Sequence, residues 1–199
     1  MTRSWRILVV VLVQTAVLAG MIGAKVWTLE TGREVLLATE PVDPTDLLRG
    51  DYVDLAYEIS LVNVDLLEGA PPAREGERLY VVLAPEEDGL WRARRAVRAL
   101  PPRSADEVAI RGRVEQVRET APVFDGDGQV VQEGHATRLR MSYGIESYFV
   151  PEGTGGALEA LRNEGNTRLR ILVAVDGRGS AAIKGLIVDG KLVAREGLF

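Results

Sequence analysis

The chain has 199 residues, a length that suits one domain or a pair of small lobes. Hydrophobic residues make up 46% of it and charged residues 27%, which excludes wholesale disorder. The net charge of −5 argues against a general nucleic-acid binder, and the absence of cysteine excludes disulfides, thiolate metal sites and cysteine nucleophiles.

The first segment is strongly apolar. Ile7–Ala24 contains eighteen residues without a charge, and Lys25 follows it. Extended to Trp27, a helix of this length covers the hydrocarbon core of a bilayer, which is roughly 30 Å thick. Trp5 and Trp27 bracket the run, as interfacial aromatic residues often do. We therefore expect residues 1–28 to form a short cytoplasmic stub and a single transmembrane anchor.

Charges ahead of the anchor set its orientation. Arg3 and Arg6 precede the apolar run, so the N-terminus is expected in the cytoplasm and residues 29–199 outside it. A cleaved signal peptide is an alternative, with Ala19 or Ala24 before the cut, although neither site has the Ala-x-Ala pattern. A buried core helix is a poorer fit to an uncharged run at the extreme N-terminus.

A capped helical turn is expected after residue 42. Asp43 suits the N-cap, Pro44 the first helical position and Gly50 the left-handed position that ends the turn. Arg49-Gly50-Asp51 then lies at a helix-to-strand junction, whereas an adhesion tripeptide needs a flexible loop tip. We expect no integrin-type adhesion from it.

Beyond this turn the hydrophobic period is two, which indicates strands. Between residues 51 and 60, Leu55, Tyr57 and Ile59 share one face and Tyr52 lies on the other. Asp189-Gly190 predicts a tight hairpin, and Gly155–Asn163 predicts one short helix. The predicted fold is mainly β with a small helical share. Its further strands are Leu79–Ala84, Leu90–Val97, Val108–Val117, Thr137–Val150, Thr167–Val175 and Ala181–Val188.

A weak internal echo runs through the chain. Residues 78–97 and 168–187 share a basic start, an apolar run, an acidic-glycine turn and a second strand, with Gly89 and Gly179 at matching places. A duplication would explain this and predicts two related lobes, residues 34–100 and 105–199. Two unrelated hairpins in a β protein would give a similar pattern.

Two motifs carry a family resemblance. Residues 50–57 read GDYVDLAY and fit G-D-Y-x-x-L-x-Y at every fixed position, and residues 143–153 read YGIESYFVPEG. The chain resembles the bacterial GDYXXLXY family over nearly its whole length. The resemblance implies an envelope protein of the inner membrane with a β-rich outer domain and no assigned activity. It also implies a multi-pass membrane protein as a plausible partner.

The two motifs define the candidate site. Leu55 and Tyr57 are expected to be buried, and the Tyr57 hydroxyl then needs a hydrogen-bond partner. Tyr52 either packs in a second layer or belongs to a binding surface; exposed clustering with Tyr143, Tyr148 and Phe149 would favour the surface. The candidate structural or partner-binding residues are Gly50, Asp51, Tyr52, Leu55, Tyr57, Tyr143, Gly144, Glu146, Tyr148, Pro151, Glu152 and Gly153.

Little in the sequence indicates catalysis. His135 is the only histidine, so a multi-histidine metal site is excluded, and we expect no cofactor. The layout of an anchor, a β-rich outer domain and Gly50-Asp51 at a strand start is loosely similar to type I signal peptidases, which use a serine activated by a lysine. Ser180 and Lys184 are the closest such pair in sequence, but four strand residues separate them by about 13 Å, which is beyond hydrogen-bond reach. Paired carboxylates could serve a glycosidase; the candidates are Asp51, Glu146, Glu152 and Glu159.

The sequence thus favours a membrane-anchored accessory or interaction protein with no catalytic residue assigned. A membrane-tethered hydrolase, similar to a peptidase or a glycosidase, is the alternative.

Overall fold

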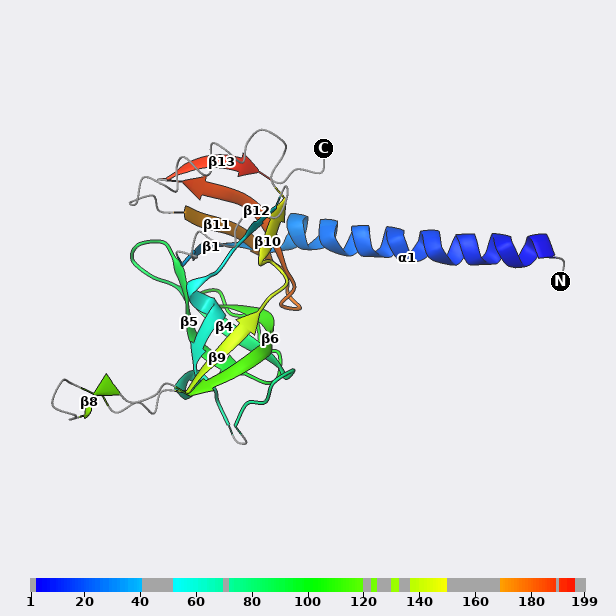
Figure 1. Cartoon of the computed structure of the whole chain (residues 1–199). Coiled ribbons are helices and arrows are strands. Elements are labelled where there is room, and N and C mark those ends of the chain that lie inside the picture. Colours follow the sequence, from blue (N-terminus) through cyan, green and yellow to red (C-terminus); the bar gives the residue numbers. More distant parts are fainter. Residues whose placement is uncertain are drawn as a thin grey trace.

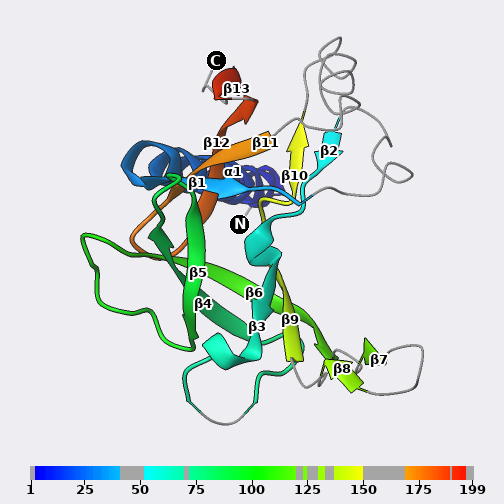
Figure 2. The same ribbon diagram turned by 90° about the vertical axis from the view of Figure 1, so that its left-hand side faces the viewer.

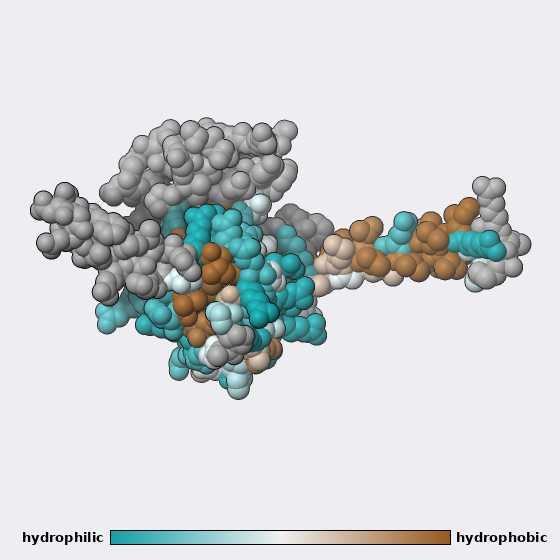
Figure 3. Space-filling view, turned by 60° about the horizontal axis from the view of Figure 1, so that its bottom comes forward, coloured by the Kyte–Doolittle hydropathy of each residue, from teal (hydrophilic) through white to brown (hydrophobic). Residues whose placement is uncertain are grey.

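The computed structural model describes residues 3–40, 52–69, 72–119, 123–124, 130–132, 137–149, 169–188 and 190–195. Helix α1 (Arg3–Thr31) projects from a β domain built mainly of two sheets (Figure 1). Its Ser4–Thr31 part is long and apolar enough to cross a membrane, and its most apolar stretch is not buried by the described chain. Figure 3 shows this helix as a largely hydrophobic rod standing clear of the domain.

The first sheet has four antiparallel strands in the order β1-β11-β12-β13. Alternating apolar residues place Val35, Leu37, Ile171 and Val173 on its fully buried face. Its strands are β1 (Arg33–Ala38), β11 (Leu169–Val175), β12 (Ala181–Val188) and β13 (Lys191–Arg195).

The second sheet has five strands in the order β3-β9-β6-β4-β5. A 3-10 turn, η3 (Val64–Leu66), carries the chain from β3 to the opposite edge, where Leu67 bridges Ala96 and the Glu68 amide donates to the Ala96 carbonyl at 2.9 Å. The two edges of this sheet are therefore brought together. Its strands are β3 (Leu61–Asn63), β4 (Arg78–Pro85), β5 (Trp91–Val97), β6 (Val108–Glu119) and β9 (Thr137–Ser142).

Two short strand pairs complete the described structure. β2 (Tyr52–Asp54) pairs with β10 (Ser147–Phe149), and β7 (Val123–Phe124) pairs with β8 (Val130–Gln132). The β2–β10 pair lies beside the four-stranded sheet (Figure 2), whereas β7 and β8 lie at the end of the domain away from α1 (Figure 1).

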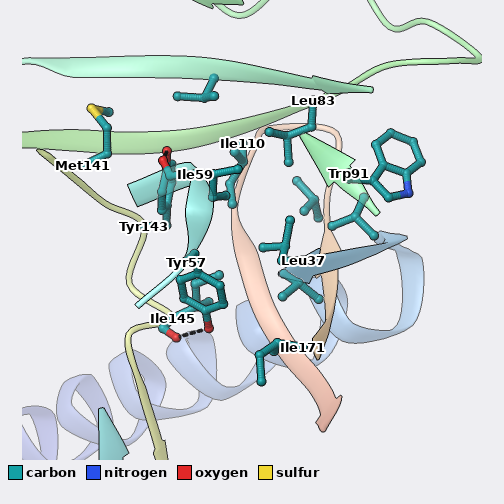
Figure 4. Close-up of a cluster of buried hydrophobic side chains, with 14 of the residues drawn as sticks. Leu37, Tyr57, Ile59, Leu83, Trp91, Ile110, Met141, Tyr143, Ile145 and Ile171 are labelled. Atoms are coloured by element: carbon teal, nitrogen blue, oxygen red, sulfur yellow. Dashed lines mark hydrogen bonds between the residues drawn. The ribbon is translucent and has the colours of Figure 1, made fainter. Parts of the chain in front are cut away.

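One hydrophobic core joins the two large sheets. Leu37 and Ile171 reach it from the four-stranded sheet, and Leu83 and Ile110 reach it from the five-stranded one (Figure 4). The turn between β11 and β12 also touches β6, because the Arg111 amide donates to the Gly179 carbonyl at 2.8 Å. The sheets therefore form one packed unit.

The predicted mainly β architecture is confirmed, with two corrections to its strands. Thr137–Val150 is not one strand, because residues 143–146 turn the chain between β9 and β10, and Gly144 has a φ of 79°. Residues 51–60 were expected to be a strand, but the described part holds only β2 and the 3-10 turn η2 (Glu58–Ser60). Burial still alternates there as predicted. The expected turn at residues 43–50 and the helix Gly155–Asn163 lie outside the described residues.

The two hairpins of the predicted internal repeat, β4–β5 and β11–β12, have the same register. In β4–β5, Val82 pairs with Arg95 and Leu83 with Ala93, so one residue bulges between them. Ninety residues later, Leu172 pairs with Gly185 and Val173 with Ile183, which gives the same bulge. The turns match too, because the Gly89 amide donates to the backbone carbonyl of Glu86 at 2.9 Å and the Gly179 amide donates to the backbone carbonyl of Asp176 at 3.0 Å.

The match extends to a third strand in each sheet. Val108 of β6 pairs with Leu83, and Val35 of β1 pairs with Val173, the residue equivalent to Leu83. Both valines are buried. The two-lobe division stays a prediction, which the shared register and bulge support. It needs one modification, because β1 comes from the N-terminal part of the chain but pairs with β11 of the C-terminal hairpin.

The junction between α1 and β1 leaves no space for a side chain. A Cβ on Gly32 would lie 2.4 Å from the Thr28 carbonyl oxygen and 2.9 Å from the Val175 amide. Gly32→Ala should therefore lower the free energy of unfolding by about 1–3 kcal/mol. Urea unfolding of the full chain in detergent, followed by circular dichroism, measures this.

Gly20→Ala is the matched control, since no atom lies within 4 Å of the Cβ it would add. Equal stability of both variants and the wild type would contradict tight packing at Gly32.

Candidate functional site

Two buried tyrosines exchange hydrogen bonds between distant parts of the chain. The Tyr57 hydroxyl donates to the Ile145 carbonyl at 2.6 Å, and the Tyr143 hydroxyl donates to the Ile59 carbonyl at 2.5 Å. Figure 4 shows the first of these bonds between the two sheets. Each tyrosine hydroxyl thus donates to the carbonyl of the residue two positions after the other tyrosine. The hydrogen-bond partner that the buried Tyr57 hydroxyl needs is therefore a backbone carbonyl. We call this arrangement the tyrosine crossing.

The local backbone around each tyrosine is held in the same way. The Tyr57 amide donates to Ser60 Oγ at 3.3 Å, and the Tyr143 amide donates to a carboxylate oxygen of Glu146, again three residues on. The other Glu146 oxygen accepts the Gly144 amide at 2.9 Å. Glu146 is therefore engaged in closing the turn that separates β9 from β10.

Apolar packing repeats around the crossing. Leu55 precedes Tyr57 by two residues as Met141 precedes Tyr143, and both are buried. The Tyr143 ring lies over Gly112 of β6, where an added Cβ would be 2.8 Å from Cε1 of the ring. These contacts tie the motif to the five-stranded sheet.

Apart from Gly144 and Glu146, which belong to the turn between β9 and β10, the family-like residues divide into three groups. Leu55, Tyr57, Tyr143 and Tyr148 are buried, so the last two form no exposed tyrosine patch. Tyr52 pairs through its backbone with Phe149. The side chains of these two, and Gly50, Asp51, Pro151, Glu152 and Gly153, lie outside the described part of the structure.

A groove of about 760 Å³ lies where α1 meets the domain. Its walls come from α1 between residues 24 and 28, from residues 144–148 and from residues 176–183. We call it the anchor groove. Sequence reasoning did not identify it, because its walls are brought together only by the fold.

The end of α1 is fixed to the domain beside this groove. Thr28 and Leu29 are 4% and 8% exposed. Thr28 Oγ1 donates to Asp176 Oδ2 at 3.2 Å, and Lys184 Nζ donates to the Leu29 carbonyl at 3.4 Å. The helix therefore continues into the domain without a free linker.

The catalytic candidates are not assembled in the described residues. Lys184 Nζ forms an ion pair with Glu34 at 2.8 Å in addition to its bond to Leu29. No group of three or more histidine, aspartate or glutamate residues that could hold a metal ion occurs in the described ranges. His135, Asp51, Glu152 and Glu159 lie outside them.

The tyrosine crossing predicts coupled effects on stability. Tyr57→Phe or Tyr143→Phe removes a buried hydroxyl and leaves a carbonyl without its donor, which should cost about 1–3 kcal/mol of unfolding free energy. Because both bonds join the same two segments, the double variant should lose less than the sum of the single losses. Urea unfolding of the wild type, the two single variants and the double variant gives this double-mutant cycle.

Tyr80→Phe serves as control, because the half-buried Tyr80 hydroxyl makes no hydrogen bond within the described residues. Losses that match this control would contradict the proposed contribution of the crossing.

Stability should also fall at alkaline pH. Burial, and to a lesser extent the nearby Glu146 carboxylate, raises the pKa of Tyr57 and of Tyr143 above the usual tyrosine value. The folded state therefore keeps both protons when unfolded tyrosines ionise near pH 10, so unfolding becomes more favourable as the pH rises, with a slope that approaches about 1.4 kcal/mol per pH unit for each tyrosine above that pH. Their contribution is complete below that pH.

Unfolding free energies should fall between about pH 9 and 11, by about 1.4 kcal/mol in total for each of the two tyrosines, and they should fall less in Tyr57→Phe than in the wild type. An unchanged slope in that variant would show that the Tyr57 hydroxyl ionises equally in both states.

Comparison with known proteins gives one match. The model of the family described as GDYXXLXY protein matches residues 14–186, which include both motifs, the tyrosine crossing, the five-stranded sheet and the four-stranded sheet as far as residue 186 of β12. No curated protein and no solved structure matches the chain. The match spans most of the 199 residues, and the chain therefore belongs to the GDYXXLXY family, which has no assigned molecular activity.

Proposed function

We propose that the protein is a single-pass accessory subunit of the bacterial inner membrane, with its β domain outside the cytoplasm and a multi-pass membrane protein as its partner. The observation that carries this proposal is the joint between α1 and the domain. The helix is free along its apolar length, while its last turn is packed into the four-stranded sheet.

The exposed apolar helix supports the anchor. Ile22 and Met21 are 64% and 67% exposed, and the described chain covers none of the most apolar stretch. Soluble monomers rarely expose contiguous apolar patches above a few hundred Å². A bilayer would cover this surface, and the two arginines ahead of it favour an N-terminus inside the cell.

The rigid joint supports an interaction role. A domain that only needed tethering could follow a flexible linker, whereas here Gly32 has no space for a side chain and Lys184 is bonded to the helix end. The domain would then stand at a fixed height and angle above the membrane. Such a placement suits contact with a second membrane protein.

The test is crosslinking in native membranes, followed by purification of the protein and identification of the proteins crosslinked to it. The wild type should reproducibly capture a multi-pass protein. Inserting Gly-Gly-Ser-Gly-Gly between Lys25 and Val26 leaves Thr28 and Leu29 packed on the domain but makes the connection from the domain to the anchor flexible. This insertion should abolish capture of the multi-pass protein.

The control is the same insertion between Gly126 and Asp127, in the connection from β7 to β8, which should retain the partner. Equal capture by both insertions would contradict a role for fixed orientation. Absence of any multi-pass partner, or a mature N-terminus at Gly20 or Lys25 in intact-mass measurements, would overturn the proposal.

A further inference from the structure

The geometry points to the anchor groove as a binding site for the headgroup of an anionic phospholipid, in the leaflet that α1 crosses last. This inference rests on the proposed membrane anchoring. It concerns a ligand of the groove and not the protein partner.

The groove lies at headgroup depth. The uncharged run begins at Ile7, and about 20 helical residues span the hydrocarbon core, which places Lys25–Thr28 at the outer membrane–water interface. Lys25, Trp27 and Thr28 line the groove. Figure 1 shows this end of α1 reaching the domain beside β10 and β12. A lipid next to the anchor therefore has its phosphate level with the groove.

The charges in the groove favour an anion. Its charged lining residues are Lys25, Arg178 and Asp176. The Asp176 carboxylate already accepts the Arg178 amide at 2.9 Å, the Ser180 amide at 2.8 Å and the Thr28 hydroxyl. Counted over these lining residues, the groove carries one net positive charge, which complements the single negative charge of a phosphodiester.

The rest of the groove suits the part of a lipid that adjoins its phosphate. Ile145, Ala182 and Ile183 supply apolar surface, and Ser147 and Ser180 supply hydroxyls. Trp27 is 64% exposed at the rim, where an indole ring fits the boundary between headgroups and acyl chains. A soluble anion would use the charges but not this apolar surface.

The experiment uses the full chain in nanodiscs of equal parts phosphatidylcholine and phosphatidylglycerol. After release from the nanodiscs, native mass spectrometry records which lipids stay bound. The wild type should retain about tenfold more phosphatidylglycerol than phosphatidylcholine, because one charge-assisted contact has an effect of that size.

Lys25→Gln/Arg178→Gln should lose this preference. Arg94→Gln/Arg118→Gln removes the same charge from exposed positions outside the groove and should keep it. Circular dichroism establishes that both double variants are folded.

Three results would overturn the inference: no preference in the wild type, the same preference in the groove variant, or the same loss in the control variant. Displacement of phosphatidylglycerol by inorganic phosphate would also overturn it, because the groove would then be a site for an anion from solution. Failure of the chain to insert into nanodiscs would instead overturn the proposed anchoring. The two failures are therefore distinguishable.

Discussion

The tyrosine crossing holds together segments that lie 84 and 88 residues apart, and both large sheets depend on it. A buried hydroxyl without a partner is costly, so each of Tyr57 and Tyr143 requires a carbonyl at one position. Those carbonyls belong to Ile59 and Ile145, whose side chains are buried in the shared core. Hydrogen bonding and packing thus select the same geometry, because each tyrosine lies two residues from the carbonyl that the other tyrosine uses.

The crossing also positions the side of the domain that meets α1. Residues 144–148, which follow Tyr143, form one wall of the anchor groove, and the β11–β12 turn forms another. That turn contacts β6 through Gly179 and the end of α1 through Asp176. The residues that name the family are therefore mainly interior in the described part, and they act on the groove by positioning its walls.

Local patterns predicted much of this structure from the sequence. The uncharged run after Arg6 predicted the helix, alternation predicted the burial of Leu55 and Tyr57, and Asp189-Gly190 predicted the last hairpin. The break in Thr137–Val150 was hidden, because Glu146 caps the turn within a stretch that keeps a period of two. The partner of Tyr57 could not be predicted, since every residue offers a carbonyl. The groove was equally inaccessible, because Thr28 and Asp176 are 148 residues apart in the chain and are brought together by the pairing of β1 with β11.

We propose that the anchor and the domain form one rigid body at the membrane. The chain lacks cysteine, so Ile22→Cys and Glu75→Cys place two spin labels specifically, one on the exposed helix and one at an exposed position just before β4 of the domain. Double electron–electron resonance in nanodiscs then measures the distance between them. The account predicts a single narrow distribution that broadens when a flexible insert follows Lys25. A broad distribution in the uninterrupted chain would contradict it.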